Sequence, residues 1–435
     1  MSVTGEFVTL NGERYYAIRN ADALPPFLVS LVSGGDHWMF VASNGGLTAG
    51  RVSPDRALFP YVTVDKIYDS TTHTGCKTVI RVEHQDTQRC WEPFNHEQRH
   101  RYETTTNLYK NLLGSRIAFE EINHDLGLAF RYTWSTSERF GFARRAEIEN
   151  LECTARTVEL LDGFQNILPA GTPRHTQANA SYLVDAYKWN EVDSQSGLGL
   201  YTLFSAITDR AEPRESLRAT TVFCLGLDDR RVLLSNRQLD AFRDGAETSG
   251  ESIMRGQRGA YLVTTALALD AEARESWQLV ADVERSHADV VALREALRDP
   301  DGLEASLAAS VDAGDDSLAR IIAAADGFQC SAEEAASTHH YANVLFNVMR
   351  GGIVDNQYTI DTQHFAAHLR SFNRRVAERH ADLLGSLPSA LDFQALMSKV
   401  GAQNDPQLVR LAFEYLPITF GRRHGDPSRP WNQFA

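Results

Sequence analysis

Lysine is scarce in this chain of 435 residues, whose 43% hydrophobic and 23% charged residues are otherwise typical of a globular protein. Only five of the 43 basic residues are lysine. Arginine binds carboxylates, phosphates and sugar hydroxyls through a planar fork. An arginine excess also follows from a GC-rich genome, so it identifies no ligand. The formal net charge of −14 argues against nucleic acid as a partner, because its phosphates select basic surfaces.

Cysteines and long apolar runs are also few. The five cysteines are scattered and lack CxxC spacing, which favours reduced thiols over a disulfide framework or a zinc site. Residues 1–10 lack the basic and apolar regions of a signal peptide. No apolar run approaches the roughly twenty residues of a membrane helix. The sequence therefore predicts a cytoplasmic protein with no membrane partner, no metal and no cofactor.

The segment from 101 to 162 has the clearest periodicity. Leu128, Phe130, Tyr132 and Trp134 alternate with smaller or polar residues. A strand turns successive side chains to opposite faces, so this pattern predicts a half-buried antiparallel strand. A second alternating run begins at 117, and Asn123 to Gly127 supply turn chemistry between the two.

Further strands are expected on both sides of this segment. They are separated by turn-rich pieces with glycine, asparagine and proline. They cover residues 7–10, 14–18, 27–32, 38–42, 140–149, 156–161, 181–189, 198–207, 217–227 and 259–269. This much β signal exceeds a simple sandwich of roughly a hundred residues. We therefore predict one very large two-sheet antiparallel sandwich over residues 1–270.

Near Ala271 the period changes to three or four. Trp277, Val280, Val283 and His287 follow the spacing of an amphipathic helix. The predicted helical linker covers 271–330 and is interrupted at 314–316. After Ser331, helices are expected over 331–350, over a stripe from 365 to 376, over 389–401 and from 405 onward. Short connections between these helices are typical of stacked αα-hairpins.

Several long segments also resemble a known family. They are TNLY (106–109), FEEINH (119–124), WSTSERFG (134–141), LDGFQN (161–166), NVLFNVMRGG (343–352) and the run at 422–432. With the order of sandwich, linker and helices, they resemble the N-terminal half of cellobiose and chitobiose phosphorylases, glycoside hydrolase family 94 and its relatives.

The resemblance implies a β-supersandwich over 1–270, a linker over 271–330 and the first hairpins of an incomplete (α/α)6 barrel over 331–435. It also implies a glycoside phosphorylase or hydrolase that acts on β-linked gluco-oligosaccharides. Inorganic phosphate is then a possible co-substrate. The family's general acid, an aspartate, is expected beyond residue 435. No catalytic residue is assigned in this chain, and the chain alone is expected to be inactive.

The terminal run supplies the candidate binding residues. A phosphate nucleophile is held well by convergent arginines and histidines, because charge-assisted bonds bind and orient it. An indole ring offers a face for sugar stacking. The candidates for phosphate or substrate binding are Arg422, Arg423, His424, Asp426, Arg429 and Trp431. The alternative is a solvated, arginine-rich loop held by Asp426.

Other clusters favour structural explanations. Glu120 and Glu121 are sequential, so on a strand they point to opposite faces and cannot share a substrate; turn chemistry is favoured for them and for His124. Trp134 is expected in the core. Neighbouring histidines, such as His339 and His340, suit a shared metal poorly. Cys76, Cys153 and Cys224 are expected to be buried, and residues 209–214 to form a salt-bridged loop.

Two alternatives to an enzyme stay open. One is a sandwich that binds carbohydrate without cleaving it, and the other is a sandwich that serves a homodimer. The truncated barrel of the first hypothesis makes a further prediction. The apolar faces formed by Phe365, Leu369 and Phe372, and by Leu408, Leu411 and Tyr415, should lie exposed.

Overall fold

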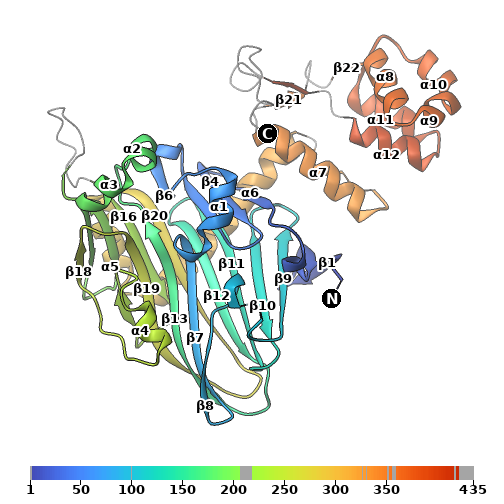
Figure 1. Ribbon diagram of the computed structural model, residues 1–435. Coiled ribbons are helices and arrows are strands. Elements are labelled where there is room, and N and C mark those ends of the chain that lie inside the picture. Colours follow the sequence, from blue (N-terminus) through green and yellow to red (C-terminus); the bar gives the residue numbers. More distant parts are fainter. Residues whose placement is uncertain are drawn as a thin grey trace. The chain divides into compact units, whose positions relative to one another are not determined.

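The computed structural model describes residues 2–98, 100–205, 218–325, 327–329, 331–349, 352–354, 359–415 and 418–420. The chain divides into two units, Met1–Asp316 and Ser317–Ala435. The first unit is built from antiparallel sheets, and the second is mainly helical (Figure 1).

The first unit contains an eleven-stranded antiparallel sheet. In spatial order its strands are β1 (Thr4–Leu10), β2 (Glu13–Arg19), β9 (Thr104–Asn111), β10 (Ile117–Asn123), β11 (Leu128–Ser137), β12 (Gly141–Asn150), β20 (Arg274–Ser286), β16 (Arg218–Leu225), β15 (Gly199–Leu203), β14 (Lys188–Val192) and β18 (Ile253–Arg255).

Two smaller antiparallel sheets accompany it. The five-stranded sheet runs β17 (Arg231–Leu233), β19 (Gly259–Leu269), β13 (Arg156–Ile167), β7 (Gly75–His84) and β8 (Thr87–Trp91). The four-stranded sheet runs β3 (Leu28–Leu31), β4 (His37–Ala42), β5 (Leu47–Arg51) and β6 (Ala57–Phe59). Short helices lie in the connections: η1 (Ala21–Ala23), η2 (Pro54–Arg56), α1 (Val64–Asp69), η3 (Ser70–Thr72), η4 (His96–Gln98), α2 (Arg174–Asn179), α3 (Ser181–Tyr187) and α4 (Leu239–Arg243).

One hydrophobic core joins these sheets. The alternating side chains of β11 all enter it, and Trp134 stacks on Phe164 of β13 with ring centroids 5.3 Å apart. Each of these rings is fully buried. A large antiparallel β region in the first part of the chain is therefore confirmed, as is the core position of Trp134.

Two helices cover the outer face of the large sheet. They are α5 (His287–Ala296) and α6 (Pro300–Ala324). Leu293, Leu303 and Leu307 of these helices pack on Phe223 and Val280 of the sheet. α5 begins with a capping box, in which the Ser286 side chain accepts the Asp289 N–H and the Asp289 carboxylate accepts the Ser286 N–H.

Three local predictions are wrong. Residues 274–286 form strand β20, so the expected helix starts only at His287. Residues 181–187 form helix α3, and only the last residues of the predicted strand belong to β14. α6 runs unbroken through 314–316, where Asp315 forms an ion pair of 2.8 Å with Arg116 of the sheet unit.

The second unit contains α7 (Glu334–Met349) and a compact group of five helices. These are α8 (Thr362–Phe372), α9 (Arg374–Arg379), α10 (Ala381–Ser386), α11 (Phe393–Gly401) and α12 (Pro406–Glu414). Two short strand pairs accompany them, β22 (Thr359–Asp361) with β23 (Ala390–Asp392), and β21 (Gly352–Val354) with β24 (Ile418–Phe420). The predicted order of β region and then helices is confirmed; an (α/α)6 barrel stays a prediction.

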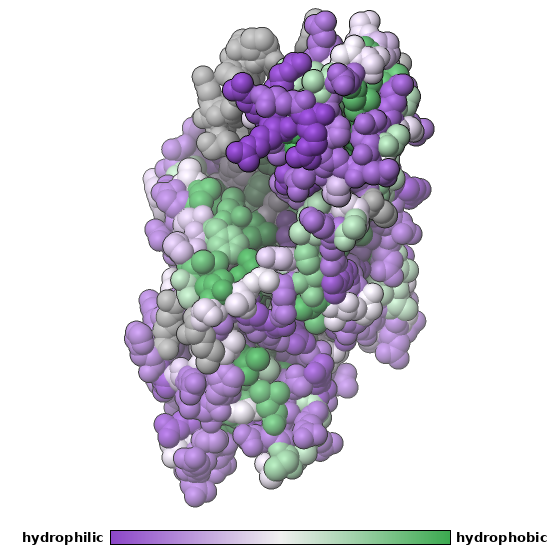
Figure 2. All heavy atoms as spheres, turned by 90° about the vertical axis from the view of Figure 1, so that its right-hand side faces the viewer, coloured by the Kyte–Doolittle hydropathy of each residue, from purple (hydrophilic) through white to green (hydrophobic). Residues whose placement is uncertain are grey.

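The five-helix group has its own core, so the expected exposed apolar faces are largely absent from it. Phe365, Leu369, Leu408 and Leu411 are at most 1% exposed and pack together. Tyr415 is buried with them, and of the six predicted residues Phe372 alone is exposed. Figure 2 shows one face of the protein, on which hydrophilic residues predominate between separate hydrophobic areas. None of the helices in the described ranges has the length and apolar character to cross a membrane.

Candidate functional site

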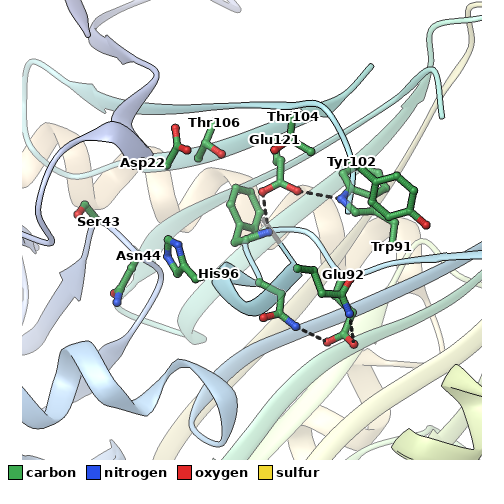
Figure 3. A pocket seen from close by; sticks show the side chains of 13 residues that line it. Asp22, Ser43, Asn44, Trp91, Glu92, His96, Tyr102, Thr104, Thr106 and Glu121 are labelled. Carbon is green, nitrogen blue, oxygen red and sulfur yellow. Dashed lines mark hydrogen bonds between the residues drawn. The ribbon is translucent and has the colours of Figure 1, made fainter. Parts of the chain in front are cut away.

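A polar hollow in the sheet unit is lined by three carboxylates, those of Asp22, Glu92 and Glu121 (Figure 3). It lies where the end of β8 and the loop after it meet β9 and β10. Glu92 belongs to that loop and Glu121 to β10. Its volume is about 30 Å³, which is room for about two water molecules.

Glu121 faces the hollow from the inner face of β10. Its two carboxylate oxygens accept hydrogen bonds from the Trp91 indole N–H (2.8 Å) and the Phe94 backbone N–H (2.9 Å). Burial raises the pKa of Glu121, and these two bonds only partly oppose that effect. The bonds tie β10 to the loop that follows β8.

Glu92 has the opposite electrostatic environment. Its oxygens accept bonds from Arg243 Nε (2.7 Å) and Nη2 (3.0 Å), from the Lys77 ammonium and from the side-chain amides of Asn95 and Gln98. Burial alone would raise the pKa of Glu92, but Arg243 and Lys77 bring it below its ordinary value. The carboxylate is therefore held in its charged form.

The loop between these carboxylates is strained at Phe94, whose φ of 63° lies in the left-handed region. The Glu121 carboxylate compensates by accepting the Phe94 N–H, and the Phe94 ring packs on Phe119 and Tyr132 of the core. Strain of this kind persists where the surroundings fix it, and it recurs at functional sites.

Two carboxylates whose pKa values are driven apart are a recurring feature of acid–base catalysis. Here, however, both oxygens of Glu121 and of Glu92 already accept protein donors. A general acid must also reach the leaving oxygen of its substrate. A hollow of two water molecules cannot hold a sugar ring, so its evident role is to position the loop after β8.

Glu120, on the opposite face of β10, belongs to a separate network. It accepts bonds from Asn107 (2.8 Å), from Arg131 (Nε, 3.1 Å) and from the Tyr109 hydroxyl. The prediction that the two sequential glutamates face opposite ways is therefore confirmed. Their assignment to turn chemistry is wrong, because both are buried on a strand. Their partners lie on other strands, which local sequence does not reveal.

One group of possible metal ligands lies within the described ranges of the chain. The ligand atoms of Asp36, His37 and Glu138 are within 4.8 Å of one another. Arg51 already occupies the space between the carboxylates, with Nε 2.7 Å from Asp36 and Nη2 3.1 Å from Glu138. Its guanidinium supplies the positive charge that a cation would otherwise bring.

A larger groove of about 600 Å³ lies in the second unit. It runs between the start of α7 and α12, and its walls include His340, Arg410 and Glu414. Arg410 and Glu414 form an ion pair at 3.7 Å. Groups of these types bind sugar hydroxyls or carboxylates, and the volume suits a small ligand.

The remaining sequence candidates divide into two groups. Arg422, Arg423, His424, Asp426, Arg429, Trp431 and the segment 209–214 lie outside the described residues. Among the others, Cys224 is buried as expected and Cys76 is partly buried, whereas Cys153 is exposed in the turn between β12 and β13. Glu92 was missed by sequence reasoning, although a charged residue directly after the buried Trp91 was a usable signal.

A family of carbohydrate-active enzymes matches one part of the chain. The model of glycoside hydrolase family 149 insertion domain 1 matches residues 354–417, which include α8 to α12. No curated protein matches the sequence. This match covers 64 of the 435 residues and supports a likeness to glycoside hydrolases and phosphorylases; membership of family 94 stays a prediction.

Solved structures are similar only at low identity. A bacterial glucoamylase complexed with acarbose has 10% identity and a TM-score of 0.38, over 89% of this chain and 54% of that one. A protein from the human microbiome, assigned as a kojibiose phosphorylase, has 10% identity and a TM-score of 0.32, over 63% of this chain and 32% of that one. A C. elegans GalM/aldose epimerase homologue has 10% identity and a TM-score of 0.35, over 60% of this chain and all of that one. The chain thus spans about half or less of the first two structures.

Proposed function

We propose that this chain is the N-terminal part of a glycoside phosphorylase or hydrolase that acts on β-linked gluco-oligosaccharides. The observation that carries the proposal is the match of residues 354–417 to a glycoside hydrolase insertion domain, which follows a large antiparallel β unit. The long segments that resemble cellobiose and chitobiose phosphorylases support the same class.

The chemistry of this class needs a carboxylic acid that protonates the leaving oxygen. Phosphate, or water activated by a second carboxylate, then attacks the anomeric carbon. Glu92 and Glu121 in the hollow of Figure 3 are bonded to protein donors, which supports an acid located elsewhere. We place that acid, an aspartate, beyond residue 435.

The terminal run is our candidate for the phosphate or sugar contact. Arg422, Arg423 and His424 would hold a phosphate through charge-assisted bonds. Arg429 would add a further cation, Asp426 would orient the arginines, and Trp431 would stack on a sugar ring. Arginine suits this task better than lysine because its fork binds two phosphate oxygens at once.

The test is an activity assay on the natural protein that contains this chain. β-1,3- and β-1,4-linked gluco-oligosaccharides are supplied with and without inorganic phosphate, and glucose 1-phosphate and glucose are measured. We expect turnover of at least one substrate, with glucose 1-phosphate as the product if phosphate is the nucleophile. A folded protein that cleaves none of these substrates under either condition would refute the proposal.

A variant of the terminal run tests its role in phosphate binding. If phosphate is the nucleophile, Arg422→Ala should raise the KM for phosphate about tenfold, because one charge-assisted bond is lost. The matched control is Arg375→Ala, which removes an exposed arginine of α9. Equal effects of the two variants would exclude the terminal run from the phosphate site.

A further inference from the structure

An open hollow of about 270 Å³ lies in the sheet unit, beside α1, α2, α3 and the end of β13. It is distinct from the hollow of Figure 3 and has about nine times its volume. This size is close to the lower end, about 300 Å³, of small-molecule sites. A single sugar ring is a ligand of the appropriate size.

The charges on its walls balance. Lys66 and Arg258 contribute two cations, and Asp69 and Asp185 contribute two carboxylates. Partial burial, and then the charge of Arg258, lower the pKa of His73 on the same wall, which favours the neutral imidazole. A balanced wall has no net attraction for phosphate, but it offers donors and acceptors to hydroxyl groups.

Asp185 is a fixed acceptor on this wall. Lys188 Nζ lies 2.7 Å from one of its oxygens, and Arg258 Nε lies 3.8 Å from the other. The Lys188 side chain is fully buried, so it has little freedom to leave this pair. A carboxylate that is oriented before binding loses less entropy when it accepts a ligand hydroxyl.

Asn166 marks the wall formed by β13. Its φ is 58°, and the register of β13 with β19 shifts between Gln165 and Ile167 around it. Its side-chain amide donates to Thr74 Oγ1 at 2.8 Å. Bulges and left-handed non-glycine residues concentrate where a side chain must be aimed at a site.

The hollow is also lined by a second amide, that of Gln177 in α2. Its side-chain oxygen has no hydrogen-bond partner among the residues that the structure describes. Leu47 and Val62 add apolar side chains to the same lining. Amides and carboxylates beside apolar side chains suit a sugar ring, which carries hydroxyl groups around an apolar face.

From this geometry we infer that the hollow binds one neutral hexose unit of a saccharide. The inference goes beyond the proposed enzyme activity, since it concerns a binding site in the sheet unit. Only the choice of glucose-containing probes rests on the proposed function.

Calorimetric titration of the whole chain tests this site. The probes are glucose, galactose, xylose, a β-linked glucose disaccharide and inorganic phosphate. We expect saturable binding of at least one hexose probe and none of phosphate at this hollow. If no sugar saturates, or if phosphate competes with the sugar, the inference is overturned.

Variants locate the binding. Ser181→Phe should fill the hollow from α3 and abolish sugar binding, and Gln177→Ala should weaken it about tenfold through the loss of a hydrogen bond. His175→Ala is the control. His175 is an exposed residue of α2, the helix that carries Gln177, and it does not line the hollow. Thermal unfolding of each variant confirms that it is folded.

Each outcome is decisive. Full affinity in a folded Ser181→Phe variant would overturn the site. If that variant does not fold, a loss of less than twofold in Gln177→Ala would do the same. Saturable binding of galactose alone would support the hollow as a hexose site, whereas saturable binding of xylose alone, a pentose, would overturn the hexose assignment. The activity assay is independent of every one of these readouts.

Discussion

The two units of this protein hold their charged groups in different ways. In the sheet unit, the Arg144 guanidinium and the Asp162 carboxylate are fully buried and pair at 2.9 and 3.0 Å. Asp162 also accepts bonds from Thr78 (2.7 Å) and the Trp277 indole (2.7 Å). These partners come from β7, β12, β13 and β20, so this polar centre depends on long-range contacts.

The five-helix group places short polar side chains at the starts of its helices. Asp361, Asn373, Asp392 and Asp405 are N-cap residues, and each side chain accepts backbone N–H groups two or three residues ahead. Such caps satisfy donors that the first turn of a helix leaves free. The difference teaches that the two units draw on separate sources of stability. We therefore expect two unfolding transitions, because units with separate cores need not unfold together.

The largest effect is expected at the buried ion pair. Asp162→Ala leaves Arg144 charged and unpaired, and should lower the free energy of unfolding of the sheet unit by about 3–5 kcal/mol. Urea unfolding followed by tryptophan fluorescence measures this, because Trp91, Trp134 and Trp277 lie in the core of that unit. The control is Asp240→Ala, which removes an exposed partner of Arg243 and should cost about 0.5 kcal/mol or less. Similar losses of stability in both variants would contradict the expected difference between the buried and the exposed ion pair.

The next largest effect concerns the helical core. Leu408→Ala removes a fully buried side chain and should destabilise the five-helix group by about 2–5 kcal/mol, leaving the fluorescence transition of the sheet unit unchanged. Far-UV circular dichroism follows the helical transition. Phe372→Ala is the matched control, since that ring is 69% exposed. A shift of both transitions by Leu408→Ala would show that the units unfold as one.

The capping aspartate of α12 should give a smaller, pH-dependent effect. Asp405→Ala is expected to cost about 1 kcal/mol at pH 7. Its bond with His380, followed by its other bonds and Arg379, lowers the pKa of Asp405 from 3.8 to about 2. Because the pKa of Asp405 is lower in the folded state than in the unfolded state, its charge stabilises the folded state at pH values above the unfolded pKa. This contribution should fade as pH falls from about 4 to 2.

Asp405→Asn separates the cap from its charge. Asparagine also caps helices well, so this variant should retain most of the stability at pH 7 and lose the acid-dependent part. Helical unfolding midpoints measured across this pH range check the prediction. An Asn variant with the same pH profile as the native chain would contradict it.

The smallest effect is expected on the surface of α9. Glu378→Gln breaks an exposed ion pair with Arg374, four residues earlier, in which Arg374 Nε lies 2.8 Å from Glu378 Oε1. Pairs of this kind contribute about 0.3–0.5 kcal/mol in low salt. Thermal unfolding at low and high salt measures the difference between variant and native chain. A loss above about 1 kcal/mol would mean that surface charge matters as much as the caps.

Sequence periodicity predicted the strands that have one polar face. In β11 the apolar positions enter the core and the intervening ones are smaller or polar, so the period of two is visible. In β20 both faces are covered. Trp277, Leu279 and Ala281 enter the sheet core, whereas Val280 packs under the outer helices. Because odd- and even-numbered positions are both apolar, the period of two is hidden, and a helix was predicted instead.

Site residues were harder to predict than strands. The prediction for Glu120 and Glu121 was correct about their direction, because direction follows from strand geometry alone. It was wrong about their role, because Trp91 and Arg131 reach them from other strands. The hollow beside Gln177 likewise needs α2, α3 and β13 to meet, and no local motif announces that meeting.

The ion pair of Arg144 and Asp162 also has a consequence for alignment of the strands. Side chains alternate between faces, so sliding β12 or β13 by a single residue would turn one partner away from the other. The misaligned chain would then have to bury a lone charge, which is costly. Most incorrect alignments of these long strands are therefore higher in free energy, and the ion pair favours the correct alignment of the two sheets.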